Sequence, residues 1–206
     1  MKNIKKSFVL LSLLAASSVN ALTLVLEDFD GYADTSSLQG DVFSFGSAAQ
    51  AGKPSLAEGL GENDTNAACF NLTWSTGNNA NLSLIKLSPN VRNLSDYSEI
   101  RASVLIENTS SGNSQSASPT RVKIAVEGGP DNSIWQTRTI KAERPTANTF
   151  YILRFDLSTS SMERVEGASS LEDVIRDIEN IRIRFEGTQQ QGFQQDAYID
   201  TIIAIQ

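Results

Sequence analysis

Arginine is the side chain that gives this sequence its clearest capacity for molecular recognition. Its guanidinium group donates paired hydrogen bonds to a carboxylate or to neighbouring sugar hydroxyls. Where apolar and polar residues alternate, basic residues fall on the polar side, and they include Arg101, Lys123, Arg138, Arg182 and Arg184. Gathered on one sheet face, such residues predict a binding site for an acidic or neutral glycan. The alternative is a solvated face on which interleaved Glu and Asp form weak cross-strand ion pairs.

Trp74 and Trp135, the two tryptophans, are candidates for stacking against a sugar. A tryptophan ring presents an apolar face that suits the C–H face of a sugar ring. Trp135 follows the turn at 129–132 and Trp74 precedes Gly77, so both lie at strand–loop junctions, where binding residues are often found. Burial in the core is the alternative for each ring. The predicted ligand-binding residues are Trp74, Trp135, Arg101, Arg138, Arg182 and Arg184.

The composition excludes several kinds of chemistry. The 206 residues contain no His and one Cys, with 17 Lys and Arg against 24 Asp and Glu. Without His there is no Ser-His-Asp or Cys-His mechanism, and a single Cys makes neither an intramolecular disulfide nor a Cys-rich zinc site. An acidic chain has no general attraction to nucleic acid, so we expect no nucleic-acid partner. Cys69 lies in an apolar run and is predicted to be buried and inert.

The first 21 residues have the pattern of a secretory signal peptide. Three Lys residues precede an apolar run from Phe8 to Ala16, and Val19-Asn20-Ala21 fits a cleavage site. The apolar run is shorter than the ~20 residues that a membrane-spanning helix needs, so we expect no membrane span. Cleavage near Ala21 would give a secreted or periplasmic bacterial protein. It would leave residues 22–206 as a single domain with a net charge of −10, which we expect to be monomeric.

Period-two alternation dominates the rest of the sequence and predicts β-strands with one buried face. The run from Ile100 to Glu107 is a clear example, with apolar residues at every second position. The strands predicted at 67–74 and 81–87 are joined by Gly77-Asn78-Asn79, which predicts a hairpin. One short helix is predicted after Ser169, whose spacing to Glu172 fits a capping box. Roughly ten strands and one helix indicate an antiparallel β-sandwich of jelly-roll type.

Two segments at opposite ends of the chain carry a resemblance to a known family. The early segment is Val25-Leu26-Glu27-Asp28-Phe29-Asp30-Gly31-Tyr32, and the late one is Ala197-Tyr198-Ile199-Asp200-Thr201-Ile202. Together they resemble the ends of galactose-binding-like jelly-roll carbohydrate-binding modules from secreted polysaccharide-degrading systems. The resemblance implies an all-β antiparallel sandwich that binds a polysaccharide or glycan and has no catalytic activity.

The resemblance also implies a structural calcium between the first and last strands. It places Glu27, and with it Asp28, near Asp200. Calcium prefers carboxylate and carbonyl oxygens, and Asp200 interrupts an apolar strand where an unpaired buried carboxylate is costly. From the residues alone, exposure of Asp200 to solvent or an ion pair with Arg is the alternative. The predicted metal ligands are Glu27, Asp28 and Asp200.

Two other classes of function stay open from the sequence. One is a structural or adhesive extracellular β-sandwich without a specific sugar site. The other is a jelly-roll polysaccharide lyase or hydrolase, since a pair of carboxylates hydrolyses glycosides without His. No spaced pair of acids stands out from the surface acids. We therefore predict no catalytic residue and a non-enzymatic role.

Overall fold

The computed structural model describes most of the chain beyond the predicted signal peptide. The described residues are 22–45, 53–74, 79–109, 120–138, 141–143, 149–187 and 193–206. The predicted signal peptide at 1–21 lies outside them. Within these ranges, none of the helices has the length and apolar character needed to span a membrane.

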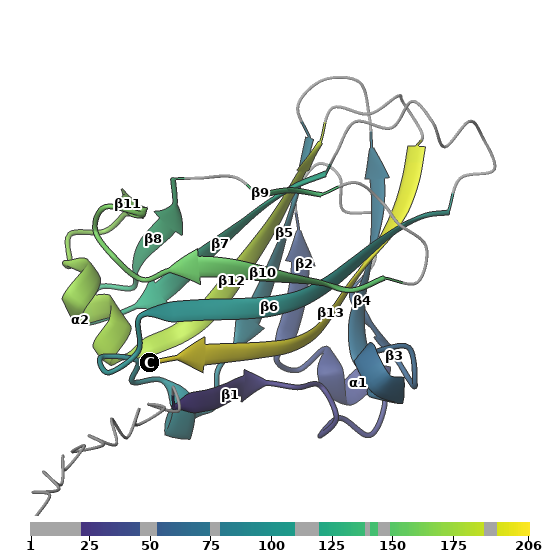
Figure 1. Cartoon of the computed structure of the whole chain (residues 1–206), viewed down its shortest axis with the longest axis horizontal. Coiled ribbons are helices and arrows are strands. Elements are labelled where there is room, and N and C mark those ends of the chain that lie inside the picture. Colours follow the sequence, from purple (N-terminus) through teal and green to yellow (C-terminus); the bar gives the residue numbers. More distant parts are fainter. Residues whose placement is uncertain are drawn as a thin grey trace, which may run out of the picture.

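One layer of the molecule is a six-stranded antiparallel sheet, called the smaller sheet below. Its strands are β1 (Thr23–Glu27), β3 (Ser55–Ala57), β4 (Ala67–Trp74), β6 (Glu99–Asn108), β10 (Tyr151–Asp156) and β13 (Phe193–Ile205). They are ordered β10-β6-β13-β4-β3, and β1 pairs with the end of β13. Thr23 lies opposite Ile205, so the first and last strands run side by side (Figure 1).

The other layer is a seven-stranded antiparallel sheet, called the larger sheet below. Its strands are β2 (Val42–Phe45), β5 (Asn79–Lys86), β7 (Thr120–Gly128), β8 (Ser133–Thr137), β9 (Lys141–Glu143), β11 (Met162–Glu166) and β12 (Ile178–Gly187). The order is β11-β8-β7-β12-β5-β2, and β9 pairs with the start of β7. Because β12 lies in the middle of this order, its outward side chains have neighbours on both sides.

The two sheets pack face to face, and their inward side chains form one main core (Figure 1). Ile100 and Val104 of the smaller sheet and Ile124 and Ile183 of the larger sheet are all fully buried. Burial of apolar surface at about 25 cal/mol per Å² is the main force that holds such layers together. The prediction of an all-β antiparallel sandwich is therefore confirmed.

The predicted hairpin across Gly77-Asn78-Asn79 is wrong. β4 pairs with β13 and β3 in the smaller sheet, whereas β5 pairs with β12 and β2 in the larger sheet. The chain therefore passes from one layer to the other between these two strands. A Gly-Asn turn signal indicates that the chain reverses, but it does not determine which sheet receives the next strand.

Two short α-helices and two 3₁₀ segments complete the described structure: α1 (Thr35–Leu38), α2 (Leu171–Arg176), η1 (Glu62–Asp64) and η2 (Pro89–Val91). The predicted capping box before α2 is displaced by one residue. Ser170 is the N-cap, and its hydroxyl accepts a hydrogen bond from the backbone N–H of Asp173 at 3.1 Å. Ser169 is not available for this role because its hydroxyl donates to Asp131.

Asp131 joins the turn between β7 and β8 to the segment that precedes α2. Its carboxylate accepts hydrogen bonds from the hydroxyls of Ser169 (2.5 Å) and Ser133 (2.7 Å) and from the backbone N–H of Ala168 (2.6 Å). These bonds, that of the Ser169 hydroxyl first, hold the pKa of Asp131 well below its usual range although the side chain is exposed. The ionised form of Asp131 therefore stabilises this junction.

We expect Asp131→Asn to lower the melting temperature at pH 7, because an amide nitrogen would face the same donors. Folding lowers the pKa of Asp131, so its contribution is present above the unfolded-state pKa of about 3.9 and is lost as the pH falls toward the folded-state value. The difference in melting temperature between wild type and variant should therefore narrow between pH 7 and pH 2 in scanning fluorimetry. Asp96→Asn is the control, and a pH-independent difference for Asp131→Asn would contradict this account.

Candidate functional site

The predicted arginines do not share one surface. Arg182 and Arg184 of β12 face outward from the larger sheet, together with Lys123 of β7. Arg138 follows β8 in the same sheet and pairs with Glu163 at 3.5 Å. Arg101 lies on β6, on the outer face of the smaller sheet. The prediction of a single cluster is corrected for Arg101, because alternation assigns a residue to a face but not to a sheet.

A hollow of about 110 Å³ opens on the outer face of the larger sheet, and we call it the larger-sheet hollow. Its lining combines apolar side chains with groups that form hydrogen bonds. The apolar side chains are those of Leu82, Ala125, Ile134 and Val165, and the polar ones are those of Lys123, Gln136, Glu166, Arg182 and Arg184. Ile124 also lies at the hollow, although its side chain is in the core. Five strands contribute to it, so the hollow depends on how the strands are paired.

The two arginines of the hollow differ in how they are held. Nη2 of Arg182 lies 2.7 Å from Oε2 of Glu127 on the neighbouring strand, and Nε lies 2.8 Å from the same oxygen. The side chains of Arg182 and Glu127 are mostly buried, at 19% and 15% exposed, so Arg182 is fixed in place. Arg184 is 45% exposed and pairs with Glu186 of its own strand at 2.6 Å. Arg184 is therefore the arginine with more freedom to meet a ligand.

The exposed ring of Phe43 belongs to a row of cross-strand neighbours that includes residues of the hollow. Gln136, Ala125, Arg182, Leu84 and Phe43 are successive cross-strand neighbours on the outer face of the larger sheet. Phe43 is 47% exposed, and it ends this row on β2. Four strand spacings of ~4.8 Å give the row a length of about 19 Å. Sequence analysis missed Phe43, because apolar residues at both 42 and 43 do not show which of them faces outward; in the structure Val42 is buried and Phe43 is exposed.

Trp74 lies in the core, so its predicted role as a sugar platform is corrected. The ring is fully buried, and Nε1 donates a hydrogen bond of 2.7 Å to Oε1 of Gln195. Gln195 is also fully buried; it accepts from the hydroxyl of Thr120 at 2.9 Å and donates to Oδ1 of Asn108 at 3.0 Å. A polar group in the core is stable only when it is paired in this way. Sequence analysis missed Gln195, because a glutamine among other amides gives no sign of burial.

Trp135 is half-buried and packs against the core from β8. Its Nε1 donates a hydrogen bond of 3.1 Å to the backbone carbonyl of Ser169, beside the start of α2. Its neighbours Ile134 and Gln136 line the larger-sheet hollow, because successive strand residues point to opposite faces. Trp135 therefore supports the strand beneath the hollow from the inside.

Cys69 is buried, as predicted. Burial, with a smaller effect of the Asp196 carboxylate, raises the pKa of its thiol to about 12. The thiolate, which is the reactive form of cysteine, is therefore scarce at neutral pH. Cys69 takes no part in the candidate site.

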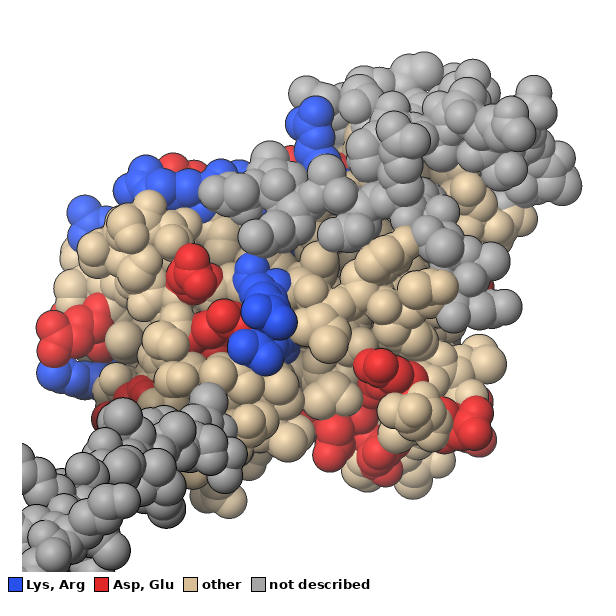
Figure 2. Space-filling view, in the orientation of Figure 1, with Lys and Arg blue, Asp and Glu red and all other residues tan. Residues whose placement is uncertain are grey.

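The acidic residues predicted to bind calcium lie where β1 meets β13. Figure 2 shows acidic side chains gathered around α1 and β3, next to this junction. Glu27 accepts hydrogen bonds from the backbone N–H groups of Asp28 (3.1 Å) and Phe29 (2.8 Å) and from the hydroxyl of Tyr32 (3.3 Å). Burial raises the pKa of Glu27 in spite of these bonds. Both oxygens of Glu27 therefore already have donors.

Asp200 is buried, at 2% exposed, and is likewise surrounded by donors. Oδ2 accepts from the backbone N–H of Glu62 at 2.8 Å and from the Thr65 hydroxyl at 3.2 Å, and Oδ1 accepts from the Thr201 hydroxyl at 3.0 Å. Burial, with a smaller effect of the Asp30 carboxylate, raises the pKa of Asp200. In the described residues no group of three or more acidic or Cys side chains converges to hold a metal.

The fold of this chain is one that known proteins share. Two stacked antiparallel sheets with the first and last strands side by side form a jelly-roll β-sandwich, the fold of carbohydrate-binding modules. No protein-family model matches the sequence, and no curated protein matches it. The fold is therefore the basis for comparison with known proteins.

The solved structures that are most similar include family 11 carbohydrate-binding modules. One, from Clostridium thermocellum in complex with a β-1,3-1,4-mixed-linked tetrasaccharide, is 15% identical, covers 89% of this chain and 95% of its own, and has a TM-score of 0.55. Another, from the Clostridium thermocellum cellulase Lic26A-Cel5E, is 14% identical over 89% and 94%, with a TM-score of 0.52. A solution structure of CtCBM11 is 12% identical over 91% and 97%, with a TM-score of 0.55. At these identities the likeness establishes the fold.

Proposed function

We propose that this protein binds a polysaccharide across the outer face of its larger sheet without cleaving it. The larger-sheet hollow is the observation that carries the proposal. A sugar ring has apolar C–H faces and a polar edge of hydroxyls, and the hollow offers both kinds of surface. Leu82 and Ala125 supply apolar contact, while Arg184, Lys123 and Gln136 supply hydrogen bonds.

The row from Gln136 to Phe43 supports a chain rather than a single sugar. Its length of about 19 Å runs across the strands and passes through Arg182. At its end the exposed ring of Phe43 is suited to stacking against a sugar face. A polysaccharide lying along this row would contact the apolar and the polar groups together.

Two carboxylates beside the hollow, those of Glu127 and Glu186, support binding rather than catalysis. Glu127 is paired with Arg182, and Glu186 is paired with Arg184. Each of these acids thus positions an arginine.

We further infer that the protein acts as a monomer after export through its first 21 residues.

The test is retardation of the mature protein in native gels that contain one polysaccharide each. The panel holds two neutral polymers, mixed-linked β-glucan and mannan, and two acidic ones, polygalacturonate and alginate. We expect at least one polymer to slow the protein relative to bovine serum albumin. Unchanged mobility in all four gels would contradict the proposal and favour an adhesive role, and release of reducing or unsaturated sugars would indicate an enzyme.

Calcium binding at the junction of β1 and β13 stays a prediction of the sequence. A bound ion would have to replace the donors that now contact Asp200, and it would stabilise the folded state by mass action. If calcium binds there, the melting temperature is higher in calcium than in EDTA, and Asp200→Asn removes the difference while Asp96→Asn keeps it. Equal melting temperatures of the wild type in calcium and EDTA would contradict the prediction.

A further inference from the structure

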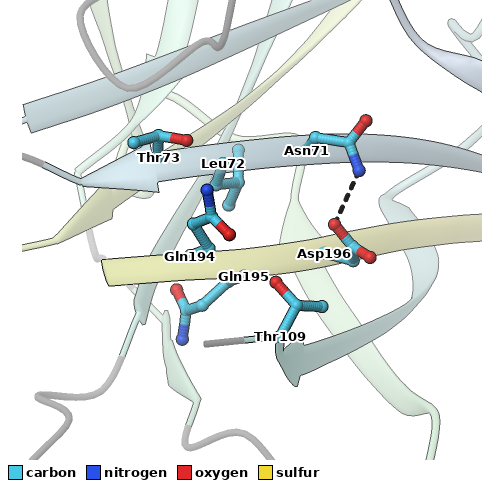
Figure 3. A pocket seen from close by; sticks show the side chains of 7 residues that line it. All are labelled: Asn71, Leu72, Thr73, Thr109, Gln194, Gln195 and Asp196. Carbon is cyan, nitrogen blue, oxygen red and sulfur yellow. Dashed lines mark hydrogen bonds between the residues drawn. The ribbon is translucent and has the colours of Figure 1, made fainter. Parts of the chain in front are cut away.

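A second pocket lies on the opposite face of the sandwich, on the outer surface of the smaller sheet (Figure 3). Its volume is about 210 Å³. The outward side chains that line it come from β4, from β13 and from the residue after β6: Asn71, Thr73, Thr109, Gln194 and Asp196. Asp196 is the one charged residue among the described lining side chains, and the others are amides and hydroxyls.

The pocket is built on strands that are held firmly in register. Asn71 lies opposite Asp196, and its Nδ2 donates a hydrogen bond of 2.7 Å to Oδ1 of that residue (Figure 3). Thr73 lies opposite Gln194 in the same pair of strands. Between Gln194 and Asp196, the side chain of Gln195 points into the core and is fixed there by Trp74. The polar groups are therefore displayed on a rigid base.

Thr73 carries a polar atom that the described structure does not satisfy. Its Oγ1 is buried and has no hydrogen-bond partner among the described residues. A buried hydroxyl without a partner lowers stability, and such atoms are rare in folded proteins. Gln194, its cross-strand neighbour, is exposed at the surface of the pocket. A ligand hydroxyl at this position would supply the partner that Thr73 lacks.

We propose that this pocket is a second sugar-binding site, which takes one neutral sugar residue through its hydroxyls. Amide and hydroxyl groups both donate and accept hydrogen bonds, as sugar hydroxyls do, and the Asp196 carboxylate adds an acceptor for a sugar O–H. The Asp196 carboxylate disfavours an anionic ligand, and the described lining contains no Lys or Arg. The volume is below the ~300–1,000 Å³ typical of sites for drug-sized ligands, which limits the ligand to about one ring.

This site goes beyond the function proposed above, because it does not depend on the larger-sheet hollow. Only one consequence rests on both sites. A molecule with a sugar site on each face of the sandwich would contact two polysaccharide chains at once.

The test is an NMR titration of the mature protein with the methyl glycosides of glucose, galactose and mannose at millimolar concentrations. We expect at least one of them to shift the side-chain amide signals of Asn71 and Gln194 in a saturable way. Thr73→Val removes the hydroxyl and keeps the shape, so it should weaken this binding at least about tenfold. The same variant should melt at a higher temperature than wild type, because an unpaired buried hydroxyl is replaced by a methyl group. If Thr73 had only a structural role, Thr73→Val would change the melting temperature without weakening the binding.

Two further variants separate this site from the hollow. Asp196→Asn keeps the shape and changes the charge, and it should also weaken the binding. Arg184→Gln, on the other face, should leave the shifts of Asn71 and Gln194 unchanged even if it abolishes polysaccharide binding. Absence of saturable shifts with all three glycosides, or wild-type affinity in Thr73→Val, would overturn the proposal.

Discussion

Replacement of Gln195 by Ala is expected to lower the free energy of unfolding by about 3–5 kcal/mol. The change removes the acceptor shared by Nε1 of Trp74 and the hydroxyl of Thr120, both in the core. Each buried donor left without a partner costs about 1–3 kcal/mol, and the cavity adds to that cost. Urea unfolding followed by tryptophan fluorescence measures the effect.

Two other variants separate the hydrogen bonds from the cavity. Gln195→Leu fills most of the space but offers no acceptor, so it should still cost at least about 2 kcal/mol. Arg154→Ala changes an exposed residue of the same sheet and should alter the free energy of unfolding by less than about 0.5 kcal/mol. A Gln195→Leu variant as stable as wild type would show that the hydrogen bonds of Gln195 contribute little.

The double variant Lys123→Gln/Arg184→Gln is expected to bind the retained polysaccharide about 10- to 100-fold more weakly. Hydrogen bonds to charged groups contribute roughly 1.5–3 kcal/mol, and about 1.4 kcal/mol corresponds to a factor of ten in affinity. Both residues line the larger-sheet hollow. We avoid Arg182 here, because its removal would leave the buried Glu127 without its partner. Isothermal titration calorimetry with an oligosaccharide of the retained polymer measures the loss.

Arg154→Gln is the control for the loss of one positive charge elsewhere on the protein. Arg154 is exposed on β10, in the smaller sheet, so this variant removes a positive charge on the opposite face. It should bind as wild type does. Equal losses in Arg154→Gln and in the double variant would show that the overall charge of the protein, rather than the hollow, controls binding.

Burial along the strands could be predicted from the sequence, whereas the pairing of the strands could not. Ile100, Val104 and Ile183 lie in the core, as their alternation predicts. The same alternation is compatible with a hairpin and with a passage from one sheet to the other, so the separation of β4 from β5 gave no local signal. Similarly, Arg101 and Arg182 each alternate with apolar residues in the sequence, but they lie on opposite faces of the molecule.

The candidate site could not be predicted from single residues. The hollow is formed by residues from five strands, and their proximity follows from the register between those strands. Trp74 shows the same limit, because a ring at the end of a strand suits a sugar platform as well as a core. The deciding feature is Gly187, where a Cβ atom would lie 3.1 Å from Cζ3 of that ring. A glycine more than a hundred positions away thus makes room for the tryptophan.

The location of a bound oligosaccharide tests the central claim most directly. We propose ¹H–¹⁵N chemical-shift mapping of the mature protein with an oligosaccharide of the polymer that retards it most. The account predicts the largest shifts at Leu82, Ala125, Gln136, Arg184 and Phe43, on the outer face of the larger sheet. Shifts that leave these residues unchanged and cluster on the smaller sheet would contradict it.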